Sequence, residues 1–198
     1  MKEIKNVIFD LGGIIVDLDI ERITKSFARL GLTPDKLDVH ALMHEMDLGN
    51  MNEQGFIDTL LPKCLPGTTG RDLVDAYNSI LRLPRHRLER IAELHKTHRT
   101  FLLSNLGDIH WCEMQRLSAE CGIQFESLFD KLFLSFQLRM TKPDERIFRH
   151  LINETGINPD ETLYIDDLEA NIAAGAKVGL ITRLVDMNRL DDVWDDIF

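Results

Sequence analysis

Five short apolar runs, each stopping at a polar cluster, constrain the fold of this 198-residue chain more than any other feature. Runs this short and this uniformly apolar are typical of strands buried on both faces, which is the pattern of a parallel sheet. The runs occupy residues 5–9 (KNVIF), 100–103 (TFLL), 131–136 (KLFLSF), 163–165 (LYI) and 179–185 (GLITRLV). They predict a sheet in which the strands share one direction.

Helical patterns lie between the last four runs, at residues 109–121, 144–155 and 169–177. In the second of these, Ile147 and Leu151 fall on one apolar stripe, as the spacing of an amphipathic helix requires. Strands that alternate with helices form right-handed βαβ units. We therefore expect an α/β fold built on a doubly wound, Rossmann-like parallel sheet.

The stretch between the first apolar run and about residue 87 has no strand candidate and contains helical patterns instead. These are marked by apolar spacing at Ile20, Ile23, Phe27 and Leu30, by the helix start Thr33-Pro34, by the N-cap Asn52, and by Leu73, Tyr77, Ile80 and Leu81. We expect a small helical cap at residues 17–86, inserted into a core formed by residues 1–16 and 87–198. Ligands of open α/β sheets bind beyond the carboxyl ends of the strands, so this cap would roof the site.

The charge balance excludes some classes of partner. The chain has 33 acidic and 23 basic residues, a net charge of −10, whereas nucleic acids and anionic membranes attract positive surfaces. Its 3 cysteines form no CxxC pair, and no uncharged run approaches the roughly 20 residues that a bilayer requires. We expect a cytoplasmic monomer or homodimer that binds neither nucleic acid nor membrane.

Polar residues follow the predicted strands at the points where each one ends. They are Asp10, Ser104 with Asn105, Lys142, and Asp166 with Asp167. Each of them alone would be an ordinary turn former, helix cap or surface residue. In a parallel sheet, however, these strand ends share one edge, so three carboxylates, a hydroxyl, an amide and an ammonium would meet there. Clustered carboxylates repel one another unless a cation holds them, and a site of oxygen ligands suits Mg²⁺. With the metal bound, we expect Lys142 to be free for a phosphate.

Four segments in this order resemble the motifs of the haloacid dehalogenase-like hydrolases. They are 9–17 (FDLGGIIVD), 103–105 (LSN), 140–143 (MTKP) and 164–167 (YIDD), the last accompanied by Asn171. The resemblance extends over essentially the whole chain, with the helical cap between the first and second motifs. Within that family the chain is similar to bacterial sugar-1-phosphate phosphatases and to the phosphatase domain of soluble epoxide hydrolase.

The resemblance implies a Mg²⁺-dependent phosphatase that acts on a small phosphorylated metabolite, with a sugar phosphate as one candidate. Asp10 would attack phosphorus and form an aspartyl-phosphate. Ser104 and the backbone N–H of Asn105 would hydrogen-bond the phosphoryl oxygens, and Lys142 would balance charge in the transition state.

The metal site implied by the same resemblance consists of Asp10, the backbone carbonyl of Gly12 and Asp167, with Asp166 acting through water. The metal would shield Asp10 from the charge of the phosphate. Asn171, one helical turn after Asp167, would brace this loop.

Gly12 is a departure from the pattern, because phosphatases of this family usually carry a second aspartate there as a general acid. General acid–base help contributes about 10²- to 10⁴-fold. Two alternatives therefore stay open: a 2-haloacid dehalogenase on the same scaffold, and a catalytically silent phosphate-binding protein.

A few further residues carry weaker expectations. His110 lies near the predicted crevice as a candidate substrate contact, although a solvent-facing histidine in the first turn of a helix is the more ordinary reading. We expect a basic patch to form the solvated start of a helix; it consists of Arg82, Arg85, Arg87 and Arg90. We expect Trp194 to pack a C-terminal helix against the core.

Overall fold

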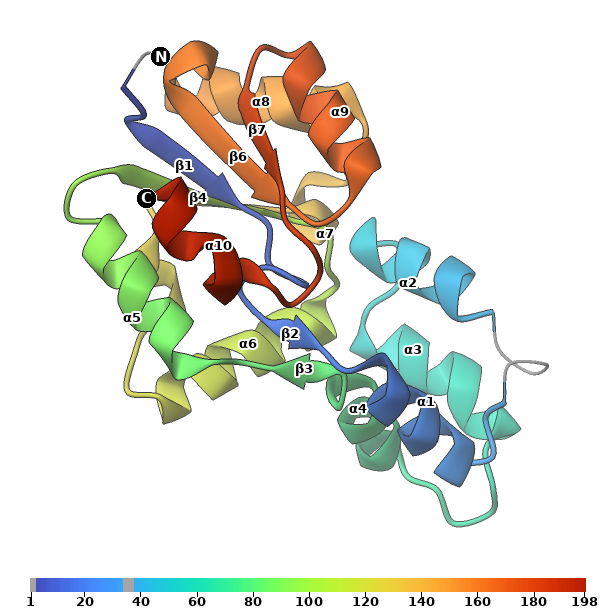
Figure 1. The fold of residues 1–198 in the computed structure, drawn as a ribbon. Helices are drawn as coiled ribbons and strands as arrows, with labels where there is room; N and C mark the ends of the chain where they lie inside the picture. Colours follow the sequence, from blue (N-terminus) through green and yellow to red (C-terminus); the bar gives the residue numbers. More distant parts are fainter. Residues whose placement is uncertain (1–2, 34–37) are drawn as a thin grey trace.

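A five-stranded parallel sheet forms the centre of the computed structural model, which describes residues 3–33 and 38–198 (Figure 1). Its strand order is β5-β4-β1-β6-β7. The strands are β1 (Asn6–Phe9), β4 (Arg99–Ser104), β5 (Lys131–Leu134), β6 (Thr162–Asp166) and β7 (Ile181–Leu184). The register pairs Phe9 of the central strand with Leu102 on one side and with Ile165 on the other, so these three strands end side by side. The predicted α/β fold is confirmed.

Helices cover both faces of this sheet. The helices of the core are α5 (Arg85–Leu94), α6 (Asp108–Glu120), α7 (Ser135–Leu138), α8 (Glu145–Thr155), α9 (Glu169–Lys177) and α10 (Leu190–Ile197), with short 3₁₀ turns at Phe125–Leu128 and Pro159–Glu161. The three helical patterns predicted between the later strands correspond to α6, α8 and α9. No helix in the part of the chain that the structure describes is long and apolar enough to cross a membrane.

Alternate side chains of the buried strands belong to two separate apolar layers, one on each face of the sheet, as the two-residue period of a strand requires. Val7 and Phe9 of β1 belong to one layer, whereas Ile8 lies in the other. On the first face the ring of Trp194 stacks on Phe9 with 6.4 Å between their centroids, which confirms the expected packing of α10 on the core. On the second face Phe148 of α8 packs against β6.

Strand β7 departs from the predicted burial on both faces. Ile181 and Leu184 are 37% and 41% exposed. The reason is its position, because β7 is the edge of the sheet and pairs with β6 on one side only. Its apolar sequence resembled that of the inner strands, so the difference depends on topology rather than on composition.

The described residues between β1 and α5 include four α-helices, at the lower right of the molecule (Figure 1). They are α1 (Ile20–Arg29), α2 (Val39–Asp47), α3 (Glu53–Leu60) and α4 (Gly70–Asn78), and a 3₁₀ turn at Leu61–Lys63 follows α3. Asn52 caps α3 through the backbone N–H of Gly55, as predicted. The predicted start of α2 at Thr33-Pro34 borders residues 34–37, which lie outside the described residues. The helix that is described begins later, at Val39, with Asp38 as its N-cap.

A two-stranded antiparallel ribbon, which sequence patterns did not predict, joins this helical segment to the rest of the chain. It consists of β2 (Asp17–Leu18) and β3 (Leu81–Arg82). Arg87 ties the ribbon down: its two guanidinium nitrogens lie 2.8 Å from Asp17 and 2.8 Å from Asp191 of α10. Arg87 is therefore buried, and the expectation that it belongs to a solvated helix start was wrong. A buried guanidinium is stable here because carboxylates and the carbonyl oxygen of Ile14 accept its hydrogen bonds.

Candidate active site

Asp10 and Asp166 lie next to each other because the strands that carry them are neighbours. β1 and β6 pair in parallel, and the backbone N–H of Asp10 donates to the carbonyl oxygen of Ile165 at 3.0 Å. Asp167 follows directly, and one ligand atom from each of these three carboxylates lies within 4.8 Å of the others. The carboxylate cluster that was expected at the carboxyl edge of the sheet is thus present in the structure.

Lys142 closes this cluster from the side of β5 and α7. Its Nζ lies 2.7 Å from Asp10 and 2.7 Å from Asp166, and its side chain is 1% exposed. Lys142, which we expect to be available for a phosphate when a metal is bound, contacts two buried carboxylates in this structure. Its ammonium offsets part of the repulsion between these two carboxylates.

Asn105 positions the backbone of Lys142. Its side-chain amide donates to the carbonyl oxygen of Lys142 at 2.9 Å, and its amide oxygen accepts from the backbone N–H of Lys142 at 2.9 Å. This pair of hydrogen bonds joins the loop after β4 to the loop before α8. Sequence analysis placed the amide of Asn105 at this edge of the sheet but did not predict that it binds the backbone of Lys142.

Asp166 is enclosed by hydrogen-bond donors. Besides Lys142, it accepts from the hydroxyl of Tyr164, from the backbone N–H of Leu168 at 2.8 Å and from the side-chain amide of Asn171 at 2.9 Å. Asn171 therefore fixes the acidic loop through Asp166. With both oxygens engaged, Asp166 is better suited to hold the loop than to bind a metal directly.

The pKa values of the cluster reflect burial and mutual repulsion. Burial, supported by the charge of Asp166, raises the pKa of Asp10 to about 7 against the opposing effect of Lys142. Burial, together with the charge of Asp166, also raises the pKa of Asp167 to about 6. Burial also acts against ionised Asp166, but the charge and hydrogen bonds of Lys142 outweigh it and hold the pKa of Asp166 below its ordinary value.

These residues fit a divalent oxygen-liganded cation. Carboxylates whose pKa values are raised by one another's charge become stable as anions when a cation lies between them. The turn that follows Asp10 leaves no room for a side chain at Gly13, which has a φ of +76° and where a Cβ would lie 2.4 Å from Asp167 Oδ2. Gly12 is different: it has no such φ, and a Cβ there would meet only the flexible side chain of Leu18, at 3.3 Å.

Two hydroxyl groups lie buried near the end of β4. Ser104 is the last residue of β4 and is buried, and β4 neighbours β1, which leads to Asp10 at the same edge of the sheet. Ser135, which sequence analysis did not single out, accepts from the backbone N–H of Leu106 at 3.0 Å. It thereby fixes the loop that carries Ser104 and Asn105 onward into α6.

His110 does not face solvent. Its ring stacks on that of Tyr77 with 3.9 Å between the centroids, and its Nε2 lies 3.4 Å from the carbonyl oxygen of Tyr77. Burial lowers the pKa of His110 to about 4, so the imidazole is neutral at physiological pH. The structure places His110 as a packing residue between α4 and α6.

Asp47, at the end of α2, is a residue near the cluster that sequence reasoning missed. Burial raises its pKa to about 7, while Lys142 lowers it and Asp10 raises it, so this carboxyl lies within the electric field of both residues. The sequence around it, a carboxylate at a helix end before Leu48-Gly49, looks like an ordinary helix terminus. Only the packing of α2 against the core reveals its position.

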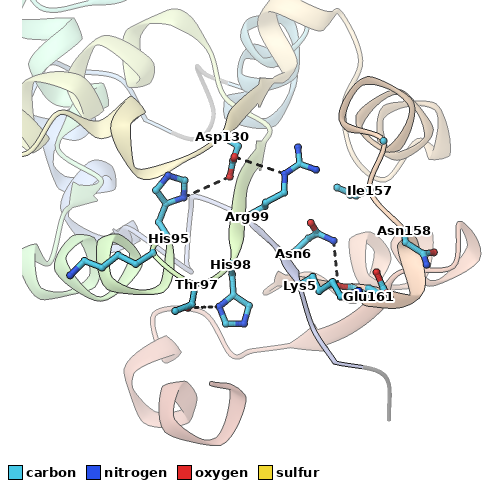
Figure 2. A pocket seen from close by; sticks show the side chains of 12 residues that line it. Lys5, Asn6, His95, Thr97, His98, Arg99, Asp130, Ile157, Asn158 and Glu161 are labelled. Atoms are coloured by element: carbon cyan, nitrogen blue, oxygen red, sulfur yellow. Dashed lines mark hydrogen bonds and ion pairs between the residues drawn. The ribbon is translucent and has the colours of Figure 1, made fainter.

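A surface hollow also lies at the opposite, amino-terminal edge of the sheet (Figure 2). Lys5 there pairs with Glu161 at 2.9 Å, and Arg99 lies 3.9 Å from Asp130 (Figure 2). Its charged groups thus neutralise one another in pairs on the surface. This hollow shares no residue with the carboxylate cluster.

Comparison with known proteins gives concordant results. The sequence profile of the haloacid dehalogenase-like hydrolases matches residues 4–179. A D-ribitol-5-phosphate phosphatase from Bacteroides thetaiotaomicron is 32% identical over 187 residues, which cover 90% of each chain.

Solved structures are similar over a comparable length. One is an enzyme of the haloacid dehalogenase-like (HAD) family from B. thetaiotaomicron, crystallised with magnesium and inorganic phosphate. It aligns with a TM-score of 0.85 and 28% identity over 93% of this chain and 95% of that one. A predicted HAD-like hydrolase from Porphyromonas gingivalis aligns with a TM-score of 0.85 and 29% identity over 99% and 98% of the two chains. The family match and the structural similarity therefore agree on the fold.

Proposed function

The chain belongs to the haloacid dehalogenase-like hydrolases, and we propose that it hydrolyses a small phosphorylated metabolite through an aspartyl-phosphate on Asp10. It is a phosphomonoester phosphatase with Mg²⁺ as its cofactor. The relative that acts on D-ribitol-5-phosphate supports a phosphorylated sugar or sugar alcohol as the substrate class. The observation that carries the proposal is the contact of Lys142 with Asp10, 2.7 Å apart within a cluster of three carboxylates.

Two successive displacements at phosphorus make up the reaction. In the first, a carboxylate oxygen of Asp10 forms a bond to phosphorus while the bond to the leaving alcohol breaks. In the second, water attacks phosphorus and the bond to Asp10 breaks, which releases inorganic phosphate. Splitting the hydrolysis in this way replaces one difficult step by two easier ones.

The residues around Asp10 stabilise the charge that develops on the phosphoryl group. The buried ammonium of Lys142 exchanges part of its contact with Asp10 for a phosphoryl oxygen, in a site from which water is largely excluded. The hydroxyl of Ser104 and the backbone N–H of Asn105 donate to the remaining oxygens.

Asp10, Asp167 and the carbonyl oxygen of Gly12 would hold the metal, with Asp166 acting through water. When bound, Mg²⁺ supplies positive charge that offsets the repulsion between the carboxylates and the phosphate. The four hydrogen-bond donors around Asp166 support its outer position, because they occupy both of its oxygens. Under this assignment, Asp167→Asn weakens Mg²⁺ binding more than Asp166→Asn does.

In this proposal residues 17–86, which include the helical segment between the two strands of the ribbon, act as a cap over a core formed by residues 1–16 and 87–198. Contacts of the segment with the start of α6 and the end of α7 support this position of the cap. The backbone N–H of Glu53 donates to Asp108 at 3.2 Å, and Asn50 lies 3.4 Å from Arg139.

Replacement of Asp10 tests the proposed function. We expect Asp10→Asn to abolish turnover of an aryl phosphate, because a carboxamide neither attacks phosphorus nor binds Mg²⁺ well. The phosphate mimic beryllofluoride should bind to the native protein with Mg²⁺ and not to the variant, as measured by ¹⁹F NMR. Asp195→Asn, an exposed change of the same type on α10, serves as the matched control. Measurable turnover by Asp10→Asn, or a native protein inert towards every phosphoester, would refute the proposal.

A further inference from the structure

The alcohol that leaves phosphorus needs a proton, and the cluster itself does not provide a suitable donor. Lys142 is shared between Asp10 and Asp166, and Asp166 accepts hydrogen bonds at both oxygens. His110 is packed beneath Tyr77 and is neutral. Gly12, two residues after the nucleophile, has no side chain. An alkoxide is a poor leaving group, so the proton must come from a group outside this cluster.

The carboxyl end of α2 lies directly on the loops that form the site. Met46, one residue before Asp47, is completely buried, and a Cβ at Gly107 in the loop after β4 would lie 3.0 Å from its side chain. Gly49, two residues after Asp47, has a φ of +68°, and a Cβ there would lie 2.3 Å from the carbonyl oxygen of Phe136. Met46 and Gly49, on either side of Asp47, are therefore fixed against the core. Figure 1 shows α2 beside α7.

This packing places Asp47, which lies between Met46 and Gly49, at the contact between the end of α2 and the loops of the core. Its pKa responds to Lys142 and to Asp10, and the pKa of the buried hydroxyl of Tyr77 responds in turn to Asp47 and Asp108. Among the described residues, the groups whose charges couple to Asp47 are thus Lys142, Asp10 and the hydroxyl of Tyr77. An ionised carboxylate so close to the site would repel the substrate's phosphate. Burial counters this by raising the pKa of Asp47 to about 7, which leaves a protonated form available to donate.

We propose that Asp47 is the general acid and base of this reaction, supplied by the helical segment rather than by the loop after β1. In the first step its carboxyl proton passes to the leaving oxygen as the bond from phosphorus to that oxygen breaks and the bond to Asp10 forms. In the second step its carboxylate takes a proton from the attacking water, which restores the starting state. The inference rests on the proposed phosphatase function, and it places the nucleophile and the proton donor on opposite sides of the substrate.

Leaving-group dependence distinguishes this role from a structural one. The experiment measures kcat and KM of the native enzyme and of Asp47→Asn, with Mg²⁺, on three substrates: an aryl phosphate, a simple alkyl phosphate without further hydroxyls, and a sugar-alcohol phosphate. An aryl oxygen leaves without much protonation. We expect Asp47→Asn to lower kcat by about 10²- to 10⁴-fold on both alkyl esters and by less than about 3-fold on the aryl ester. Glu45→Gln, an exposed change on the same helix, should leave all three unchanged.

Each contrary pattern overturns the inference for a stated reason. An equal loss on aryl and alkyl esters indicates a displaced helix or a damaged site. A loss confined to the sugar-alcohol phosphate and expressed in KM indicates that Asp47 binds a substrate hydroxyl. Unchanged kcat on the alkyl esters removes Asp47 from the chemistry while the proposed function stands. Inactivity of the native enzyme towards all three esters overturns both proposals.

Folding of the variant is checked separately by thermal unfolding. Asparagine has nearly the shape of aspartate, so Asp47→Asn should unfold within a few degrees of the native protein. A second variant, Asp47→Ser, removes the carboxyl in a different way and should give the same contrast between aryl and alkyl esters. If the two variants disagree on that contrast, the proton-donor role is wrong.

Discussion

Asp167 offers a test of the acidic cluster that needs no substrate, because its replacement should change stability in opposite directions with and without metal. The carboxyl has a pKa raised from 3.8 to about 6, chiefly by burial and then by the charge of Asp166. The folded protein therefore binds the proton more tightly than the unfolded chain does. The stability gained from protonation is complete below pH 3.8 and is lost as the pH rises through about 6. In chelator at pH 8, Asp167→Asn should consequently be more stable than the native protein.

The size of this effect follows from the two pKa values. Their difference corresponds to at most about 3 kcal/mol, and solvent screening of a half-buried carboxylate reduces this to about 1–2 kcal/mol. In a chain of this length such a gain raises the melting temperature by about 2–8 °C. Mg²⁺ should reverse the order. At a concentration 100 times its dissociation constant, a ligand stabilises the folded state by about 2.7 kcal/mol, which the variant largely forgoes.

Thermal unfolding followed by circular dichroism, between pH 4 and pH 8, measures both parts of this prediction. In chelator the advantage of Asp167→Asn should shrink as the pH falls from 6 towards 4, because Asp167 of the folded native protein takes up a proton in this range and loses its unfavourable charge. With saturating Mg²⁺ at pH 8 the native protein should melt at the higher temperature. A variant that is less stable in chelator at every pH would contradict the repulsion inferred for the cluster. Equal stabilisation of the two proteins by Mg²⁺ would remove Asp167 from the metal site.

Two further predictions concern neighbouring residues. Lys142→Ala should lower kcat on an aryl phosphate by several orders of magnitude and, in chelator, destabilise the protein by about 3–5 kcal/mol because two buried carboxylates lose their cation; a near-normal rate, or an unchanged denaturation midpoint, would contradict this. Gly13→Ala should abolish the stabilisation by Mg²⁺ that calorimetry detects, because the added methyl group would displace Asp167. Gly12→Ala, which meets only a flexible leucine, is its matched control, and an equal effect of the two changes would argue against the reasoning.

The core of the site could be predicted because it depends on strand order alone. Asp10 and Asp166 each follow an apolar run, and parallel strands bring such positions to one edge. The end of β5 was harder to predict from the sequence. The apolar run at 131–136 continues to Phe136, but the strand ends at Leu134, where the hydroxyl of Ser135 binds the loop after β4. That contact joins residues 29 positions apart.

Residues missed by sequence analysis owe their positions to packing between distant segments. Asp47 sits at an unremarkable helix end, and only the burial of Met46 against the loop after β4 brings it near the nucleophile. Arg87 looks like a surface residue among other arginines, yet carboxylates at positions 17 and 191 enclose it. A one-dimensional pattern contains no signal for either contact, because the partners lie dozens of residues away.

The ribbon of β2 and β3 has a consequence for how enzymes of this architecture diversify. The helical segment begins after β2 and ends before β3, and Asp17 and Arg82 at its base are directly paired. The helical segment between them can therefore change in length, or be exchanged by recombination, while the two paired residues at its base stay in place. If Asp47 donates the proton, such an exchange would replace the acid together with the surface that selects the alcohol. The core, which carries the nucleophile, and the helical segment, which fits the leaving alcohol, could then evolve separately.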